Sequence, residues 1–519
     1  MRDIVAFTFR GVAAAQGRPR RIVLPMRGHR RATLDWRAQR SSDVAFRKGR
    51  LEGEVPERVA RYTSSLEEDA EILEEVLLVN AAHLRSLNRM GFLDDGALRR
   101  AMEALRSFPR DALRSADPRL EDVHMVVEEH LKAAVPEAGE NLALGKSRND
   151  AVSAAIRMRL RRYMAEIVLS GSKLAEALIS KAEENAATLF PLFTHEQPAA
   201  PGTLGFVLAA HSSRLLKALR QLVHAYRDVN ESPLGAGPVG GTSVPHDRRA
   251  IAEDLGFEGL VENALEASSS RDFGVTFLAA LLRVAVVLTD LAEELVRYAS
   301  HDPPLLDMDD VYFSTSSIMP HKRNPVVAEI ARTSLSKVLG ELVRFSVNVG
   351  RRFGGYVLDL QESTEPIWRG VRWVKETMEV MEAMVRSIRP GKASGTSIPP
   401  VTGLTEYAAW LTMTGRTSFR RAHYLCGKVA SMLVSGMPFE SVEAFLRSSG
   451  LDEEAVSELK GFLNPVRVLG SYAVTGSARE EEVRRMVVGL RRECEELRSW
   501  AEERLRVEDE CRKRLLGFT

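Results

Sequence analysis

Hydroxyl groups stand beside fixed positive charge near the middle of the chain, in "STSSIMPHKRNP", Ser314–Pro325. Long amphipathic helical patterns flank this stretch on both sides. A hydroxyl is a poor base in water and removes a proton only where its surroundings stabilise the alkoxide. Cations and N–H groups provide that stabilisation, and they also suit an anionic intermediate. The residue types therefore allow base catalysis here, with a simple polar turn as the alternative interpretation.

Three further polar stretches interrupt the helical patterns: Gly145–Asp150, Thr194–Gly205 and Pro233–Arg248. Loops mounted on rigid elements often carry binding and catalytic groups. Each stretch also has a structural interpretation, because residues such as Ser147 and Asn149 could cap the helix that follows. Taken singly, each stretch is more typical of a turn or a cap than of a site.

The sequence indicates neither a dinucleotide-binding site nor a metal site. "GAGPVG", Gly235–Gly240, matches a dinucleotide-binding pattern, but no predicted strand precedes it and Pro238 lies inside it. The eleven histidines include no H-E-x-x-H pair, and the cysteines Cys426, Cys494 and Cys511 lack metal-ligand spacing.

Charge and composition argue against nucleic acid or a membrane as the main partner. The chain has 72 basic and 71 acidic residues among 519, for a net charge of +1. No uninterrupted apolar run approaches the roughly 20 residues that cross a bilayer. Three cysteines are too few for a disulfide framework. We therefore expect a cytoplasmic protein.

The first 45 residues depart from this balance, because they are rich in arginine and almost free of acid. A nucleic-acid-binding arm, a targeting peptide and a disordered tail all have such a composition. A downstream translation start, for example at Met26, is a further alternative. We treat 1–45 as a basic N-terminal extension.

Helical periodicity dominates from about Glu57 onward. Four patterns in the middle of the chain are far longer than an average helix and apolar on broad faces, which favours a bundle whose core extends into an oligomer. Shorter, charged helices follow Pro399 and Pro400, and alternating strand patterns are nearly absent. The sequence therefore predicts an all-α protein, with three helical domains at 46–145, 146–397 and 398–519.

The polar stretches together resemble a known family. "SSIMPHKRNP" is similar to the signature loop of the fumarase/aspartase superfamily, whose members eliminate fumarate from succinyl adducts. "EDVHMVVEEHL", "GKSRNDAV", "THEQPAAPGTLG", "PLGAGPVGGTSVPHDR", "ENALEASSSRDF" and "SFRRAHYLCGKV" resemble the argininosuccinate lyase family in order and spacing. The resemblance covers roughly residues 46 to 480.

This resemblance implies a three-domain, fumarase/aspartase-like subunit with a long central helical bundle. It implies a homotetramer in which loops of three subunits build each active site. The implied reaction is cleavage of argininosuccinate to arginine and fumarate, the last step of arginine biosynthesis, without a metal or an organic cofactor.

The motifs also imply roles for individual residues. Ser316 matches the catalytic serine and is the expected base, Lys322 would stabilise negative charge, and His195 would donate a proton. The implied substrate-binding residues are Ser65, His124, Ser147, Arg148, Asn149, Thr194, Gln197, Arg248, Asn324, Tyr356 and Gln361.

Several positions depart from the family pattern. Leu358 stands where a lysine that helps hold a substrate carboxylate is usual, Thr315 replaces a glycine, and Glu196 replaces an apolar neighbour of His195. "MPHKRNP" is closer to the spelling of adenylosuccinate lyases and carboxymuconate cycloisomerases, whereas "KSRND" favours argininosuccinate lyase. An adenylosuccinate lyase-like enzyme, another divergent member of the superfamily and a non-catalytic paralogue therefore stay open as alternatives.

Overall fold

The computed structural model describes residues 53–350 and 353–517. The chain divides into two units, 1–56 and 57–519, and only Gly53–Pro56 of the first is described. The extension predicted at 1–45 lies outside the described residues. The architecture below is that of the second unit.

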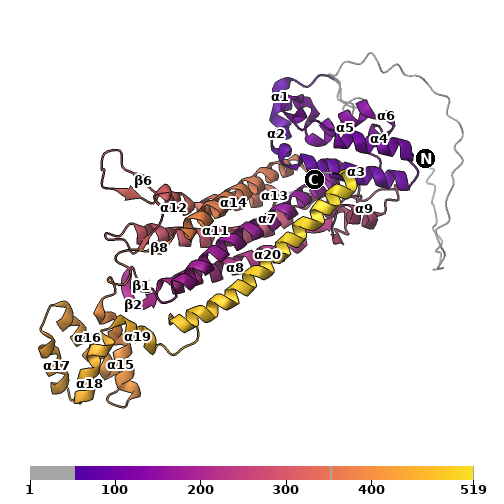
Figure 1. Ribbon diagram of the computed structural model, residues 1–519. Coiled ribbons are helices and arrows are strands. Elements are labelled where there is room, and N and C mark those ends of the chain that lie inside the picture. The colour runs from indigo at the N-terminus through magenta and orange to yellow at the C-terminus, as the bar shows by residue number, and fades with distance from the viewer. Residues whose placement is uncertain (1–52, 351–352, 518–519) are drawn as a thin grey trace, which may run out of the picture. The chain divides into compact units, whose positions relative to one another are not determined.

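The prediction of an all-α protein is confirmed, since helices make up most of this unit (Figure 1). Its N-terminal part is built from short and medium helices around buried apolar side chains such as Leu77, Leu84 and Val127. These helices are α1 (Glu57–Thr63), α2 (Leu66–Asp69), α3 (Leu73–Arg89), α4 (Asp95–Arg106), α5 (Val123–Ala134) and α6 (Pro136–Gly139).

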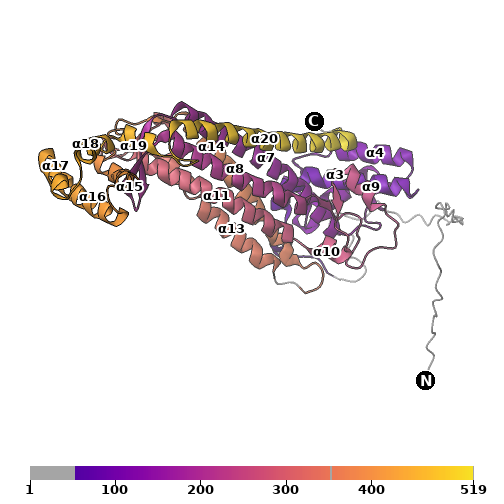
Figure 2. The same cartoon turned by 90° about the horizontal axis from the view of Figure 1, so that it is seen from below.

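Long helices lie side by side in a central bundle (Figures 1 and 2). They are α7 (Arg148–Glu184), α8 (Leu204–Val229), α11 (Asp272–Ala299), α13 (Ser334–Val349), α14 (Thr364–Arg386) and α20 (Glu480–Leu516). The C-terminal helix α20 packs along α7 and α8 and reaches α3. Residues distant in sequence thus share one core.

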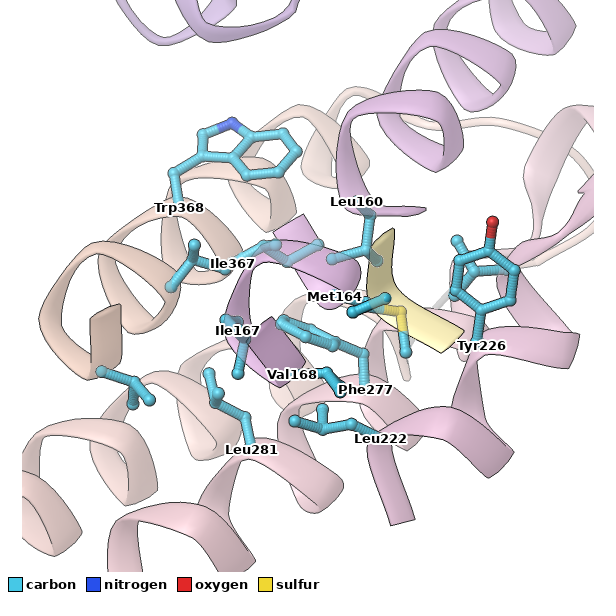
Figure 3. Close-up of a cluster of buried hydrophobic side chains, with 14 of the residues drawn as sticks. Leu160, Met164, Ile167, Val168, Leu222, Tyr226, Phe277, Leu281, Ile367 and Trp368 are labelled. Atoms are coloured by element: carbon cyan, nitrogen blue, oxygen red, sulfur yellow. The ribbon is translucent and has the colours of Figure 1, made fainter. Parts of the chain in front are cut away.

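The bundle core follows from the helical spacing of apolar residues in α7. Leu160, Met164, Ile167 and Val168 lie on one face at intervals of three and four residues and are buried. Figure 3 shows them among side chains of the neighbouring helices α8, α11 and α14. Those neighbours include Leu222 and Tyr226 of α8, Phe277 and Leu281 of α11, and Ile367 and Trp368 of α14.

A second, smaller core belongs to a group of helices near the C-terminus. Its buried side chains include Tyr407, Leu425 and Leu459. The helices are α15 (Leu404–Met413), α16 (Phe419–Val434), α17 (Phe439–Ser448), α18 (Glu453–Phe462) and α19 (Pro465–Ser471). The division at 398 stays a prediction, and α20 packs in the bundle rather than in this group.

Short elements fill the connections between the helices. The strands pair two by two: β1 (Leu189–Thr194) with β2 (Gln197–Thr203), β3 (Glu231–Ser232) with β4 (Gly259–Leu260), β5 (Leu306–Asp307) with β8 (Arg389–Pro390), and β6 (Ser314–Thr315) with β7 (Arg323–Asn324). The short α-helices are α9 (Arg248–Asp254), α10 (Ala264–Ser269) and α12 (Val326–Ala331). The 3-10 turns are η2 (Ala70–Ile72), η3 (Ala112–Ser115), η4 (Pro118–Leu120), η5 (Asp310–Tyr312), η6 (Leu358–Ser363) and η7 (Pro400–Gly403).

Helix α11 is, in the part of the chain that the structure describes, the one helix long and apolar enough to cross a membrane. More than half of its apolar window, 56%, is buried in the protein, and it packs against α8, α13 and α14. It therefore has the environment of a core helix. Uninterrupted apolar runs in the sequence do not single it out, because Arg283 divides it.

Candidate active site

The predicted site residues fall into two groups at opposite ends of the central bundle (Figure 1). Arg148 begins α7, whereas His195 lies in the hairpin that follows the end of α7. A helix of 37 residues is about 55 Å long. The two groups within one chain are therefore too far apart to act on one small substrate.

In the first group, Ser65 is held by a buried carboxylate. Its Oγ donates a hydrogen bond to Asp69 Oδ2 at 2.8 Å, and the Val123 backbone N–H donates to the same oxygen at 3.3 Å. Burial and the neighbouring Asp122 carboxylate raise the pKa of Asp69 to about 7. The hydroxyl of Ser65 therefore has a fixed orientation beside the start of α5.

Arg148 lies against two carboxylates that precede α5. Its Nη1 is 3.3 Å from Glu121 Oε2 and 3.2 Å from Asp122 Oδ2. Asp122 also caps α5, because its side chain accepts from the Met125 N–H at 2.9 Å. These contacts place the guanidinium next to the Ser65–Asp69 pair.

Ser147 caps α7, as one of the two interpretations of its sequence position predicts. Its Oγ accepts from the Asn149 N–H at 3.2 Å. Ser147, Arg148 and Asn149 are all only partly buried. The capping turn therefore leaves part of each residue accessible.

His124 is buried in the same region, with 7% of its surface exposed. Its Nε2 has no hydrogen-bond partner among the described residues. Burial, with the nearby Lys146 and Arg148 cations, holds the pKa of His124 well below its usual value. The imidazole is therefore neutral at physiological pH.

Two residues that follow the serine loop in sequence return to this first group. Gln361 Nε2 donates to the Thr63 carbonyl at 3.2 Å. Burial raises the pKa of Tyr356, which lies near Arg271 and the carboxylates of Asp122 and Asp69. Both residues therefore join the side of the molecule that carries Ser65 and Arg148.

Arg248 has a structural environment. Its guanidinium donates to the Val261 carbonyl at 2.7 Å and to the Glu262 carbonyl at 3.3 Å. Longer hydrogen bonds reach the carbonyls of Ser232, Pro233 and Leu234. These contacts tie the glycine-rich loop to β3 and β4. A substrate contact for Arg248 stays a prediction.

In the second group, His195 lies at the tip of the β1–β2 hairpin. Thr194 pairs with Gln197 across the two-residue turn, and both turn residues have positive φ, 49° at His195 and 62° at Glu196. Such φ values are typical of a type I′ hairpin turn but strained for side chains other than glycine. The turn therefore projects His195 and Glu196 from the end of the bundle.

Glu196 pairs with a cation on α11. Its Oε1 is 2.6 Å from Arg297 Nη1, and Arg297 also pairs with Glu293 at 2.8 Å. Glu196 stands where the family pattern has an apolar residue, and in the structure its carboxylate forms an ion pair with Arg297.

Ser316 lies in the loop between β6 and β7. Its Oγ accepts from the backbone N–H groups of Met319 at 3.1 Å and Ile318 at 3.3 Å. Two N–H donors on one hydroxyl oxygen stabilise its alkoxide form. Lys322 is exposed in the same loop, and Asn324 pairs with Ser314 across the strands.

Arg323 anchors this loop at its base, a role that the sequence did not suggest. Its Nη1 is 2.9 Å from Asp307 Oδ1, its Nε donates to Asp310 Oδ1 at 2.9 Å, and its guanidinium lies 3.4 Å from the ring centre of Phe313. The sequence feature that could have pointed to this role is the position of Arg323 between Lys322 and Asn324 in the signature loop. The base of the loop is held while its tip is exposed.

Comparisons with known proteins bear on the family and the fold of the chain. A family model described as Lyase matches residues 49–340. The argininosuccinate lyase of Methanosarcina barkeri is 33% identical over 449 residues, 85% of this chain and 91% of the relative. That of Methanocaldococcus jannaschii is 31% identical and covers 91% of this chain and 99% of the relative.

Solved structures show the same fold. An EDDS lyase variant with bound fumarate has a TM-score of 0.78 at 22% identity, over 89% of this chain and 95% of that one. A class II fumarase from Schistosoma mansoni has a TM-score of 0.66 at 14% identity, over 79% and 92%. The fold is thus that of the fumarase/aspartase lyases. The chain belongs to the argininosuccinate lyase family of that superfamily.

Proposed function

We propose that the protein cleaves argininosuccinate to arginine and fumarate, as the last step of arginine biosynthesis. The observation that carries this proposal is the Ser316 hydroxyl, which accepts two backbone N–H groups in a cationic loop. Relatives named argininosuccinate lyase at 31–33% identity over most of the chain support this choice of substrate.

The reaction is a β-elimination. Ser316 takes the proton from the carbon next to a carboxylate, and the electron pair forms a doubly negative aci-carboxylate intermediate. Lys322 and the two N–H groups stabilise this negative charge. The carbon–nitrogen bond then breaks, fumarate forms, and the departing guanidino nitrogen takes a proton from His195. No step needs a metal or an organic cofactor.

The other predicted residues bind the substrate. Arg148 suits a carboxylate, because a guanidinium can make two parallel hydrogen bonds to it. Asn324, Thr194 and Gln197 flank the reacting groups at the other end of the bundle. The first group adds Ser65, His124, Ser147, Asn149, Tyr356 and Gln361.

We place the protein in the cytoplasm as a homotetramer. In such an assembly the first group of one subunit would lie next to the second group of another. About 55 Å of helix separates Arg148 from the hairpin of His195 within one chain. Leu339, Val343 and Val347 expose an apolar stripe of α13, between 44% and 56% accessible, at four-residue spacing. Apolar stripes of this kind suit burial against a second copy.

The test offers the purified protein argininosuccinate and adenylosuccinate separately and follows fumarate by its absorbance. We expect turnover of argininosuccinate. If only adenylosuccinate is turned over, the substrate is adenylosuccinate and not argininosuccinate. Turnover of neither compound would contradict the proposal.

A separate variant tests the assignment of Ser316 as the base. Ser316→Ala should lower kcat by at least about 10²-fold, because no other group at that position can take the proton. Ser317→Ala, one residue further along the loop, is the matched control. Wild-type rates in Ser316→Ala would contradict the role of Ser316.

A further inference from the structure

Lys146 lies immediately ahead of the Ser147–Asn149 turn and has no role in the mechanism above. Its Nζ donates to Asn80 Oδ1 at 2.6 Å, and Asn80 on α3 is only 1% exposed. Burial lowers the pKa of Lys146 to about 8. Its ammonium is therefore charged at neutral pH in a poorly solvated place.

The charge of Lys146 is not matched by an adjacent carboxylate. No carboxylate of the described residues forms an ion pair with it, and its hydrogen-bond partner is a neutral amide. Lys132 on α5, by contrast, pairs with Glu128 at 2.8 Å and Glu129 at 2.9 Å. An unpaired, partly desolvated ammonium costs free energy in the ligand-free protein.

The charged and titratable groups around Lys146 come from each packed element. On α3 and ahead of α9, His83 and His246 have pKa values lowered by burial and are neutral. On α5, His124 is likewise neutral, and Glu128 acts on Lys146 only at longer range.

Two further groups belong to α7. Arg148 is matched by Glu121 and Asp122. Burial raises the pKa of Asp150 to about 7, and its Oδ2 accepts from the Gly237 N–H at 2.9 Å. Asp150 is therefore only partly ionised at pH 7. Glu128 and Asp150 therefore attract the charge of Lys146 beside the turn, but neither forms an ion pair with it.

We infer that Lys146 is a positioning residue for an anionic ligand, whose carboxylate at the Ser147–Asn149 turn supplies the charge that Lys146 lacks in the free protein. The inference rests on the proposed function, in which Arg148 of this turn binds a substrate carboxylate. In this role Lys146 supplies positive charge to the substrate site of a chain that has Leu358 where the family has a lysine.

The probe is fumarate, with its Kd measured by calorimetry for the full-length wild type, Lys146→Met and Lys146→Arg. We expect Lys146→Met to raise the Kd on the order of tenfold at pH 7, since one charge interaction across a few ångströms of protein is lost. Lys146→Arg should recover most of the affinity. Lys181→Met, which removes a paired lysine at the far end of α7, should leave the Kd unchanged.

The pH profile separates this role from a purely structural one. Above pH 8 the wild-type ammonium loses its proton, so the affinity for fumarate should fall between pH 7 and 9.5. The fall should be absent in Lys146→Met and displaced to higher pH in Lys146→Arg. If Lys146→Met does not fold, the wild-type and Lys146→Arg profiles still decide, and identical profiles would overturn the inference.

The outcomes for the inference and for the proposed function differ. Equal fumarate affinities in wild type and Lys146→Met overturn the inference, whatever the turnover of argininosuccinate. If fumarate binding depends on Lys146 but argininosuccinate is not turned over, the proposed substrate is wrong and the inference about Lys146 is supported. A wild type that does not bind fumarate overturns both.

Discussion

Gln361 Nε2 donates a hydrogen bond to the carbonyl oxygen of Thr63, 298 positions earlier in the chain, at 3.2 Å. The bond joins η6 to the end of α1, two residues before Ser65. The segment after the serine loop thus returns to the end of the bundle that carries Arg148, while Ser316 and His195 stay at the other end. One chain keeps the two halves of the proposed site apart.

Mixed assemblies test this separation. His195→Ala and Arg148→Ala, each inactive alone, should regain activity when unfolded together and reassembled, because some sites then receive both intact residues from different subunits. Random mixing gives about a quarter of sites with both residues intact. Fumarate release by the mixture is the measurement.

The control for complementation places both changes in one chain. A double variant carrying His195→Ala and Arg148→Ala, reassembled with Arg148→Ala alone, should stay inactive because no Arg148 is present. A mixture of the two single variants that recovers no activity would contradict the shared site.

Restoring a cation at position 358 tests how the chain handles an anionic substrate. Leu358 lies at the start of η6 with 51% of its surface exposed, so a lysine fits there without a buried charge. Leu358→Lys should lower the KM for argininosuccinate several-fold and change kcat little, because it adds attraction in substrate and transition state alike. Leu358→Met is the control of similar size, and an equal fall in its KM would assign the effect to shape rather than charge.

Glu508 makes the stability of the bundle depend on pH. This carboxyl on α20 is buried, 3.6 Å from Arg161 Nε, and burial raises its pKa from 4.5 to about 7. A raised carboxyl pKa means that the folded state holds the proton more tightly, so ionisation costs stability as pH rises through 7. Below pH 4.5 both states are protonated and the cost vanishes.

Glu508→Gln removes this titration. Its free energy of unfolding relative to wild type should move in favour of the variant by an amount on the order of 2 to 3 kcal/mol between pH 5 and pH 8. Urea unfolding at one protein concentration measures the difference. Glu502→Gln, at an exposed position of the same helix, should show no such trend; the same difference at both pH values for Glu508→Gln would refute the prediction.

Much of the fold could be read from local pattern, because helix formation depends on the spacing of apolar residues. The apolar positions of α7, from Leu160 to Val168, recur at helical intervals and are buried where the pattern places them. The place of α20 could not be read in this way. Its pairing with α7 depends on contacts between residues more than 300 positions apart, which a local pattern does not contain.

The site divides in the same manner. The sequence by itself determined which chemistry is possible, because a serine, a lysine and an asparagine stand in one short loop. The types and spacing of its residues also predict the family to which the chain belongs. Only the tertiary structure decided the charge and partner of each group. Burial raises the pKa of Asp69, Glu196 is paired with Arg297, and Lys146 forms no ion pair with a carboxylate of the described residues. Burial and distant neighbours set these properties, and both arise only when remote segments pack together.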